Sequence, residues 1–264
     1  MTQASFDAAA AAYDRRVGRW SRLYVPALIA AVDIRPGDRV LDVATGTGEA
    51  AVVAAPAAEP GGWILGCDIS LPMLRAARSK LSDTTVLLAV MDAQALACRD
   101  ESVDAVICQL GLMFFPDVVR GLREFHRVLR QGRWMAASVW SSPKRAPFVS
   151  IFPDVMTRYV PAKRDEMLAG TSLGDGRRLH DLAVGAGFRA VAVTAVTQQI
   201  VFAAFEEYWE PIAAGGSPTA ALYKDLPEAT RDAVREEVRA RMQPYVSGGR
   251  LVLDSEALLV VGRK

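Results

Sequence analysis

The amino-acid sequence predicts an α/β protein built on a doubly wound, mostly parallel sheet. Five short apolar runs alternate with segments of helical pattern before residue 141, as in parallel sheets covered by helices on both faces. A glycine-containing turn follows the first run and leads directly into a helix-forming segment, which is how nucleotide-binding α/β units begin. The chain of 264 residues is long enough for one large domain of this class with a cap.

The five runs have the apolar character of strands buried on both faces. In chain order we expect strands over residues 40–43, 63–67, 84–90, 103–108 and 133–140. Between them we expect helices over residues 49–55, 73–80 and 117–129. Ser70 can cap the second helix, with Pro72 tolerated in its first turn. Pro56, Pro60 and two following glycines are expected to end the first helix.

The alternation of strands and helices stops at residue 141. Four prolines separate short helical pieces before residue 176, and a helix over 177–186 then leads to a sixth strand over 188–196. A second helical stretch covers 203–247, and a last strand is expected over 257–262. Insertions before the last two strands would cap the carboxyl ends of the strands, where open α/β sheets bind their ligands.

Charge and cysteine content exclude several classes of protein. The formal net charge is +1, from 31 basic and 30 acidic residues, and the most basic run, 231–241, is interleaved with acids. We therefore expect no nucleic acid partner. No apolar run approaches the ~20 residues of a membrane span, and the N-terminus lacks the pattern of a secretory signal. Three cysteines without CxxC spacing predict reduced thiols, no metal site and a cytoplasmic protein.

The glycine turn is compatible with two cofactors. Gly46 and Gly48 let the backbone turn tightly and let a ligand approach it, while the following helix points free N–H groups at that ligand. Together with Ala51 they fit the dinucleotide fingerprint G-x-G-x-x-G/A. Asp42, four residues before Gly46, is not part of that fingerprint. Its carboxylate would repel a diphosphate and attract the ammonium and sulfonium groups of S-adenosylmethionine, which favours the methyl donor.

The stretch RVLDVATGTGEAA, residues 39–51, resembles motif I of the class I S-adenosylmethionine-dependent methyltransferases, with Ala44 where the family often has glycine. Residues 108–117 and 123–133 resemble further stretches of these enzymes, and the Phe-Asp and Tyr-Asp pairs near the N-terminus resemble the ubiquinone and menaquinone biosynthesis type (methyltransferase type 11 group). The resemblance implies a Rossmann-like methyltransferase sheet of seven strands, the last antiparallel, with a helical cap. It also implies that the N-terminal segment covers the site.

On this basis we expect six parts along the chain. They are an N-terminal helical lid (1–32), the S-adenosylmethionine-binding core (33–140), a cap insertion (141–176), a continuation of the core (177–202), a second cap insertion (203–250) and the last core strand (251–264).

The candidate cofactor site combines the glycine turn with the ends of the next three strands. Asp68, 20 residues beyond Gly48, can accept both hydroxyls of a ribose, which S-adenosylmethionine and NAD share. By resemblance, Asp92 accepts from the adenine amino group, the N–H of Ala93 meets a ring nitrogen, and the carbonyl near Gln109 faces the methionine ammonium. The complete candidate set is Asp42, Ala44, Thr45, Gly46, Gly48, Asp68, Ile69, Met73, Asp92, Ala93, Gln109 and Leu110.

The resemblance predicts transfer of a methyl group to a small molecule, with S-adenosylhomocysteine as the product. Displacement at a sulfonium needs a collinear nucleophile and a dry pocket, and a base only if the acceptor binds protonated. We name no catalytic residue, because His126 and His180 both lie in helices where a structural role is expected. The aromatic-rich cap suggests an apolar or aromatic acceptor. Candidate acceptor-pocket residues are Tyr13, Trp20, Met113, Phe114, Trp140 and Tyr208.

Two alternatives stay open. The first is an NAD(P)-dependent oxidoreductase, although Tyr159 and Lys163, which have the short-chain reductase spacing, are separated by Pro161. The second is a non-methylating S-adenosylmethionine-binding protein on the same fold. The sequence leaves the oligomeric state open between monomer and homodimer.

Overall fold

The computed structural model describes residues 3–13, 18–81 and 85–264. Asp14, Arg15 and Arg16 of the expected lid and Thr84 of the expected third strand lie outside these residues. The chain forms one sheet in the order β3-β2-β1-β4-β5-β8-β6. Its strands are β1 (Arg39–Val43), β2 (Trp63–Asp68), β3 (Val86–Val90), β4 (Val103–Gln109), β5 (Leu129–Trp140), β6 (Arg189–Phe202) and β8 (Arg250–Arg263), and the short β7 (Val246–Ser247) pairs with β8.

The first five strands are parallel, whereas β8 is antiparallel to both β5 and β6. This confirms the expected Rossmann-like methyltransferase sheet with its last strand antiparallel. The two-residue β7 is an addition that the sequence pattern did not predict.

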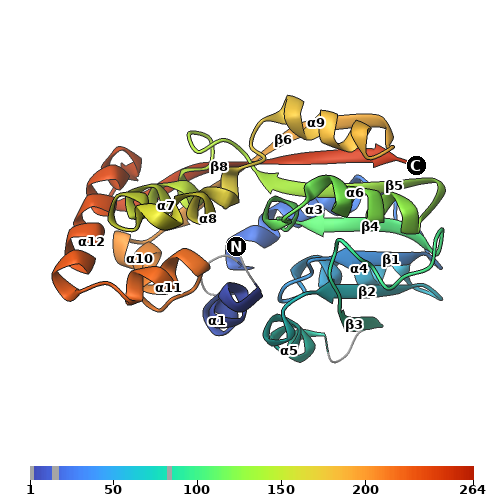
Figure 1. The fold of residues 1–264 in the computed structure, drawn as a ribbon, viewed down its shortest axis with the longest axis horizontal. Helices are drawn as coiled ribbons and strands as arrows, with labels where there is room; N and C mark the ends of the chain where they lie inside the picture. Colours follow the sequence, from blue (N-terminus) through green and yellow to red (C-terminus); the bar gives the residue numbers. More distant parts are fainter. Residues whose placement is uncertain (1–2, 14–17, 82–84) are drawn as a thin grey trace.

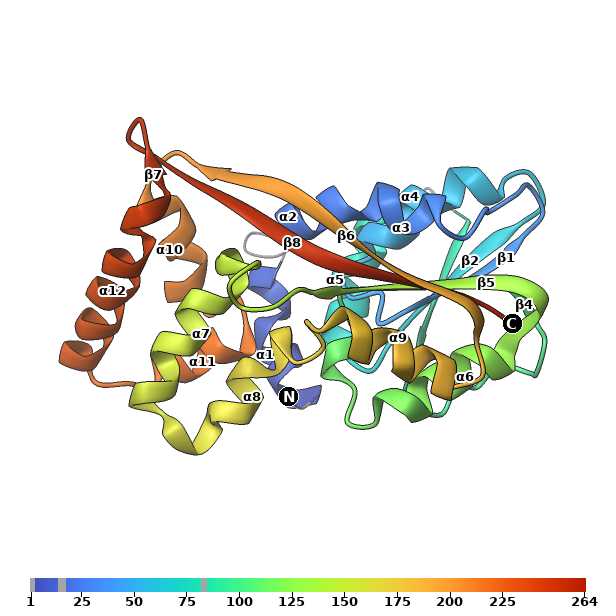
Figure 2. The same cartoon turned by 90° about the horizontal axis from the view of Figure 1, so that it is seen from above.

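Helices cover both faces of the sheet (Figures 1 and 2). On one face lie α3 (Val25–Ala30), α4 (Glu49–Ala58) and α5 (Leu71–Lys80). Helix α3 packs on β4 and β5, α4 on β1 and β2, and α5 on β2 and β3. On the other face lie α6 (Val118–Val128) and α9 (Gly176–Gly185). The predicted cap on α5 is confirmed, since the Ser70 hydroxyl accepts from the Met73 N–H at 3.3 Å.

Helix α4 continues through Pro56 to Ala58, so the expectation that Pro56 ends it is wrong. Pro56 and Val52, one turn before it, are both exposed, so water can satisfy the Val52 carbonyl that loses its helical donor. Ala54, Ala55 and Ala58 stay buried against the sheet and hold the last turn in place.

Three strands are longer than expected. β5 starts at Leu129, where the sequence pattern predicted only the end of a helix. Its pairing with β4 has a register irregularity between Val103 and Ala105. β6 and β8 pair continuously from Val196 opposite Ala257 to Phe202 opposite Leu251. Figure 2 shows this long ribbon leaving the core and reaching the helices at the other end of the molecule. A polar stretch such as Thr197–Gln199 has no strand pattern of its own, but it is held by its partner strand.

The helices beyond the carboxyl edge of the sheet are α7 (Pro147–Tyr159), α8 (Arg164–Leu168), α10 (Phe205–Ala213), α11 (Pro218–Lys224) and α12 (Glu228–Met242), and they gather together (Figure 1). One apolar cluster continues from the sheet into them, from Phe125 and Met135 through Trp140 to Phe152 and Trp209. The cap is therefore held to the core by a shared apolar interior.

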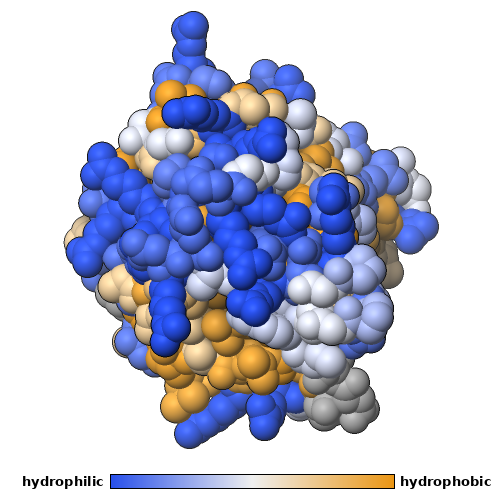
Figure 3. All heavy atoms as spheres, turned by 90° about the vertical axis from the view of Figure 1, so that its right-hand side faces the viewer, coloured by the Kyte–Doolittle hydropathy of each residue, from blue (hydrophilic) through white to orange (hydrophobic). Residues whose placement is uncertain are grey.

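One face of the molecule and the outer side of α12 are rich in polar side chains. Figure 3 shows a largely hydrophilic face with a hydrophobic patch at its lower edge. On α12, Arg235 and Arg239 pair with Glu206, and Arg241 pairs with Asp154. Within the described residues, none of the helices combines the length and apolarity that crossing a bilayer requires.

Candidate active site

A cavity of about 370 Å³ lies at the carboxyl ends of β1, β2, β3 and β4 and is covered by α1 (Gln3–Tyr13). This volume is in the range of small-molecule sites. The edge is also where open α/β sheets bind ligands. The lining residues are Gln3, Phe6, Tyr13, Ala44, Gly46, Asp68, Ile69, Met73, Met91, Asp92, Ala93, Gln94, Gln109, Leu110, Gly111, Phe114, Phe115 and Pro116.

The turn after β1 follows an unusual backbone path. Ala44, Gly46 and Gly48 have φ of 55°, 56° and 86°, in the left-handed region. Glycine adopts this conformation freely, whereas Ala44 adopts it at a cost of about 1 kcal/mol. The Gly48 N–H donates to the Thr45 carbonyl at 2.9 Å, and Gly48 is the N-cap residue of α4. The path directs the positive end of α4 toward the cavity.

Asp68 holds this turn from the end of β2. One carboxylate oxygen accepts from the Gly46 N–H and the other from the Ser70 N–H, both at 2.9 Å. Burial raises the pKa of Asp68, while these N–H donors oppose the rise. The carboxylate lines the cavity and has further lone pairs for ligand hydroxyls.

Asp42 lies behind the turn and is completely buried. Its Oδ2 accepts from the Thr45 hydroxyl at 2.6 Å, and its Oδ1 has no hydrogen-bond partner among the described residues. Burial raises the pKa of Asp42 to about 7, partly opposed by the Thr45 hydroxyl. A buried carboxyl with an unused oxygen suits a cationic ligand nearby and does not suit a diphosphate.

The loop after β3 is closed by Asp92, whose Oδ1 accepts from the Gln94 N–H at 2.8 Å. Gln94 in turn accepts from the Asp117 N–H at 2.8 Å through its Oε1. This bond ties the β3 loop to the start of α6. Asp92, Ala93 and Gln94 all line the cavity.

The end of β4 is fixed by the Gln109 side chain. Its Nε2 donates to the Ser21 carbonyl at 3.0 Å, and its Oε1 accepts from the Ser138 hydroxyl at 2.8 Å. The next residue, Leu110, has a φ of 52° and so also takes the left-handed conformation. The chain then turns through η3 (Leu112–Phe114), which presents Phe114 to the cavity.

Helix α1 contacts two walls of the cavity. Its Phe6 ring meets Phe114 edge to face, with centroids 5.2 Å apart. Its Asp7 carboxylate accepts from the Ser70 hydroxyl at 2.5 Å, next to Asp68. Gln3 and Tyr13 add to the lining. Helix α1 thus lies over the cavity.

The structure brings most of the candidate cofactor residues together. Nine of the twelve line the cavity, namely Ala44, Gly46, Asp68, Ile69, Met73, Asp92, Ala93, Gln109 and Leu110. Of the other three, Thr45 and Gly48 belong to the turn itself, and Asp42 holds it from behind through the Thr45 hydroxyl.

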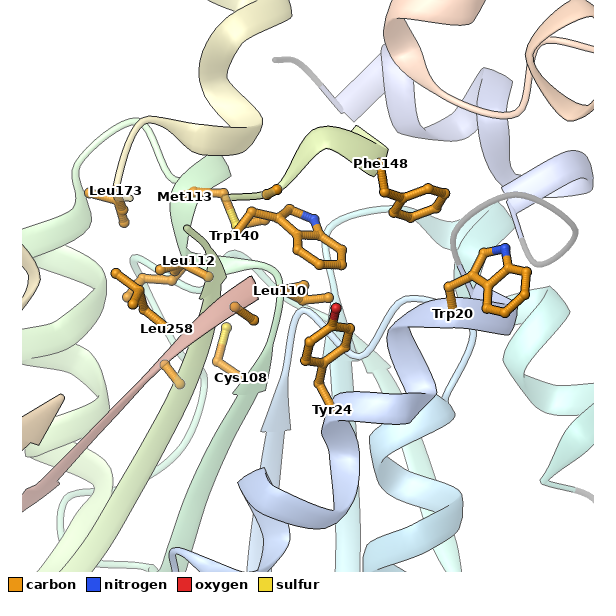
Figure 4. Packing of buried hydrophobic residues seen from close by; sticks show 14 of the residues in the cluster. Trp20, Tyr24, Cys108, Leu110, Leu112, Met113, Trp140, Phe148, Leu173 and Leu258 are labelled. Atoms are coloured by element: carbon orange, nitrogen blue, oxygen red, sulfur yellow. The ribbon is translucent and has the colours of Figure 1, made fainter. Parts of the chain in front are cut away.

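Fewer of the candidate acceptor residues lie at the cavity. Tyr13 and Phe114 line the cavity, whereas Trp20, Met113, Trp140 and Tyr208 are not among the described lining residues. Trp20 meets Phe202 with ring centroids 5.0 Å apart. Trp140 meets Tyr24 at 5.2 Å inside the same apolar cluster, and Figure 4 shows these two rings next to each other. These four side chains therefore pack in the core.

The candidate set missed several lining residues, Gln3, Met91, Gln94, Gly111, Phe115 and Pro116, and it did not assign Phe6 to the wall. Phe115 and Pro116 belong to the stretch 108–117 whose resemblance was recognised, so that stretch could have revealed them. Gln3 and Gln94 carry no local signal, because only the tertiary fold brings them to the cavity.

Neither histidine is among the described lining residues. His126 packs against Phe188, with ring centroids 5.2 Å apart, and burial lowers its pKa. His180 is exposed beside Asp181. Tyr159 ends α7 while Lys163 lies in η4 (Pro161–Lys163), so the reductase spacing does not fall on one helix.

The sheet order and the cavity at its carboxyl edge define a Rossmann-like cofactor-binding domain. A family model described as a methyltransferase domain matches residues 41–137. A demethylmenaquinone methyltransferase of Streptomyces griseus subsp. griseus is 32% identical over 161 residues, which are 59% of this chain and 67% of the relative.

Two solved structures share the fold. The YcgJ protein from Bacillus subtilis aligns with a TM-score of 0.63 at 18% identity, over 92% of this chain and 98% of the other. Phosphoethanolamine N-methyltransferase 2 of Haemonchus contortus, solved with phosphomonomethylethanolamine and S-adenosylhomocysteine, aligns with a TM-score of 0.60 at 18% identity, over 98% and 57% of the two chains.

The chain therefore belongs to the class I S-adenosylmethionine-dependent methyltransferases. It is an enzyme whose cofactor is S-adenosylmethionine. The buried Asp42 and the carboxylate of Asp68 fit a cationic adenosyl ligand.

Gly111→Ala should destabilise the protein by roughly 1–3 kcal/mol, because the new Cβ would lie 2.6 Å from the Ala44 Cβ. Ala44→Gly alone should be nearly neutral, since relief of the left-handed strain offsets the added chain entropy. The double variant should recover most of the lost stability in urea unfolding. Simple additivity of the two effects would contradict the contact.

The stability of the ligand-free protein should fall between about pH 4 and 7 because of Asp42. Its folded pKa of about 7 lies above the ordinary value, so the folded state binds the proton more tightly and loses that advantage as pH rises to 7. The free energy of unfolding relative to Asp42→Asn should decline by up to about 1.4 kcal/mol per pH unit. Asp181→Asn on the exposed face of α9 is the control, and parallel pH curves for wild type and Asp42→Asn would refute the assignment.

Proposed function

We propose that this methyltransferase transfers the methyl group to a small, apolar or aromatic acceptor inside the cavity beneath α1. The observation that carries the proposal is the two-sided lining of one cavity. Asp68 and Asp92 lie on the side formed by β2 and β3, and the rings of Phe6, Tyr13 and Phe114 lie on the side formed by α1 and η3. A charged cofactor and an apolar acceptor would meet between these walls.

In this proposal, Asp68 accepts from the ribose hydroxyls and the 92–94 loop binds the adenine edge. Ile69 and Met73 supply apolar contacts to the base, and the carboxyl of Asp42 acts on the cationic ligand through the field behind the turn. The bound cofactor supplies a methyl group already activated by a sulfonium.

Catalysis would then depend on positioning and exclusion of water. The titratable side chains among the described lining residues are Tyr13, Asp68 and Asp92, and Asp68 is held by two backbone N–H groups. We therefore assign no general base and propose an acceptor whose nucleophile is unprotonated when it binds. Phe6 and Phe114 would keep the reacting groups dry and aligned.

The N-terminal segment is proposed to act as a lid, and the six-part division of the chain remains a working scheme. The curated relative's name, demethylmenaquinone methyltransferase, indicates an aromatic acceptor in that protein and supports the proposed acceptor class. We also propose a cytoplasmic enzyme without a nucleic acid partner, in keeping with three free cysteines and the paired arginines of α12.

Calorimetric titration tests the assignment of the cavity. The wild-type protein should bind S-adenosylmethionine and S-adenosylhomocysteine and should not bind NADPH. Asp68→Ala should weaken both adenosyl ligands by at least about tenfold, because the variant loses the ribose acceptor and the anchor of the turn. Asp181→Ala, on exposed α9, should bind like wild type.

Binding of NADPH alone, or unchanged binding by Asp68→Ala, would contradict the assignment. A labelled methyl donor then tests the acceptor class. Transfer to aromatic probes that are unprotonated at the assay pH, such as 2-naphthalenethiolate, should exceed transfer to phosphoethanolamine, since the described lining offers aromatic rings to the acceptor and carboxylates that would repel a phosphate. Preference for the phosphorylated amine would contradict the apolar acceptor.

A further inference from the structure

We propose that Gly121 on α6 is a positioning residue for cofactor recognition, because it provides the space for the Phe115 ring and so sets the width of the cavity beside the 92–94 loop. The inference rests on the proposed function, in which that loop binds adenine. Gly121 lies outside the lining itself and would act only through Phe115.

The contact between the two residues leaves no room for a side chain on Gly121. A Cβ built there would lie 2.5 Å from Cδ2 and 2.8 Å from Cε2 of Phe115. Carbon atoms in contact normally lie about 3.5–4.0 Å apart. The absence of a side chain on this turn of α6 thus allows the Phe115 ring to lie directly against the helix.

The backbone around Phe115 is tied down on both sides. The Phe115 N–H donates to the Leu112 carbonyl at 3.2 Å, and the Asp117 N–H donates to Gln94 Oε1 at 2.8 Å. Asp117 also caps α6, and its carbonyl accepts from the Gly121 N–H at 3.1 Å. Since both chain segments are fixed, a methyl group on residue 121 must be accommodated by rotation of the Phe115 side chain.

The direction of that rotation is set by the core. Phe125 lies behind Phe115, with the two rings nearly perpendicular and their centroids 6.1 Å apart, and Phe125 is completely buried. The ring cannot move inward without disturbing this packing. Phe115 already lines the cavity together with Gln94 and Pro116, so the ring would turn into the cavity and narrow it there.

Gly121→Ala tests this inference, with Gly185→Ala as a matched control. Gly121 lies inside α6 and Gly185 is the last residue of α9, so both changes raise helix propensity, the change at Gly185 by less. A Cβ on Gly185 would meet nothing within 4 Å. Calorimetry with S-adenosylhomocysteine and with 5′-methylthioadenosine, which keeps the base and ribose, should show about tenfold weaker binding of both by Gly121→Ala and no change for Gly185→Ala.

Phe115→Leu supplies the second arm. For each protein we compare the affinity for an N6-benzyl derivative of S-adenosylhomocysteine with the affinity for S-adenosylhomocysteine itself. This ratio should be higher for Phe115→Leu than for wild type, because the smaller side chain widens the cavity. Adding Gly121→Ala to Phe115→Leu should then have little further effect on S-adenosylhomocysteine, which a purely structural role of Gly121 does not predict. This arm holds even if Gly121→Ala alone fails to fold.

Equal affinity of wild type and Gly121→Ala for both ligands would overturn the inference while leaving the proposed function intact. The same holds if Phe115→Leu has the same relative affinity for the N6-benzyl derivative as wild type. Failure of the wild-type protein to bind either adenosyl ligand would instead overturn the proposed assignment of the cavity and this inference with it.

Discussion

The hydrogen bond from the Gly46 N–H to the Asp68 carboxylate is the constraint on which the site depends. It joins the turn after β1 to the end of β2, while Asp42 holds the same turn from behind through Thr45. With both carboxylates in place, three residues of the turn keep left-handed conformations and α4 points its N-terminus at the cavity. Two acidic groups near one loop repel each other in the free protein, and a cationic ligand relieves that repulsion. In the proposed function, these two acidic groups therefore favour a cationic cofactor.

The long β6–β8 ribbon connects this site to the cap. Its paired extension carries α10 to α12 beyond the carboxyl edge of the sheet, and the shared apolar cluster holds them there. Helix α1 packs between this group and α5, where Phe6 and Asp7 reach η3 and Ser70. The cavity is therefore closed by segments that are far apart in the sequence.

Features that depend on short-range pattern were predicted well from the sequence. Local periodicity and spacing give the succession of strands along the chain and the cap at Ser70. They also place Asp68 and Asp92 at strand ends. Features decided by tertiary partners were not. Trp20 and Trp140 are of a residue type that often lines pockets, but both pack in the core. The residue type alone could not distinguish the two places, because an aromatic side chain suits either. The polar half of β6 becomes a strand only through β8, and Phe115 takes its place in the wall only because Gly121 leaves room for it.

Hydrogen–deuterium exchange with and without S-adenosylhomocysteine tests the central claim most directly, because it reports where the ligand acts along the whole chain. The account predicts slower exchange in the turn at 44–48, in the segments that follow β2, β3 and β4, and in α1, with α12 unaffected. Protection confined to α9 or to the cap helices would contradict it.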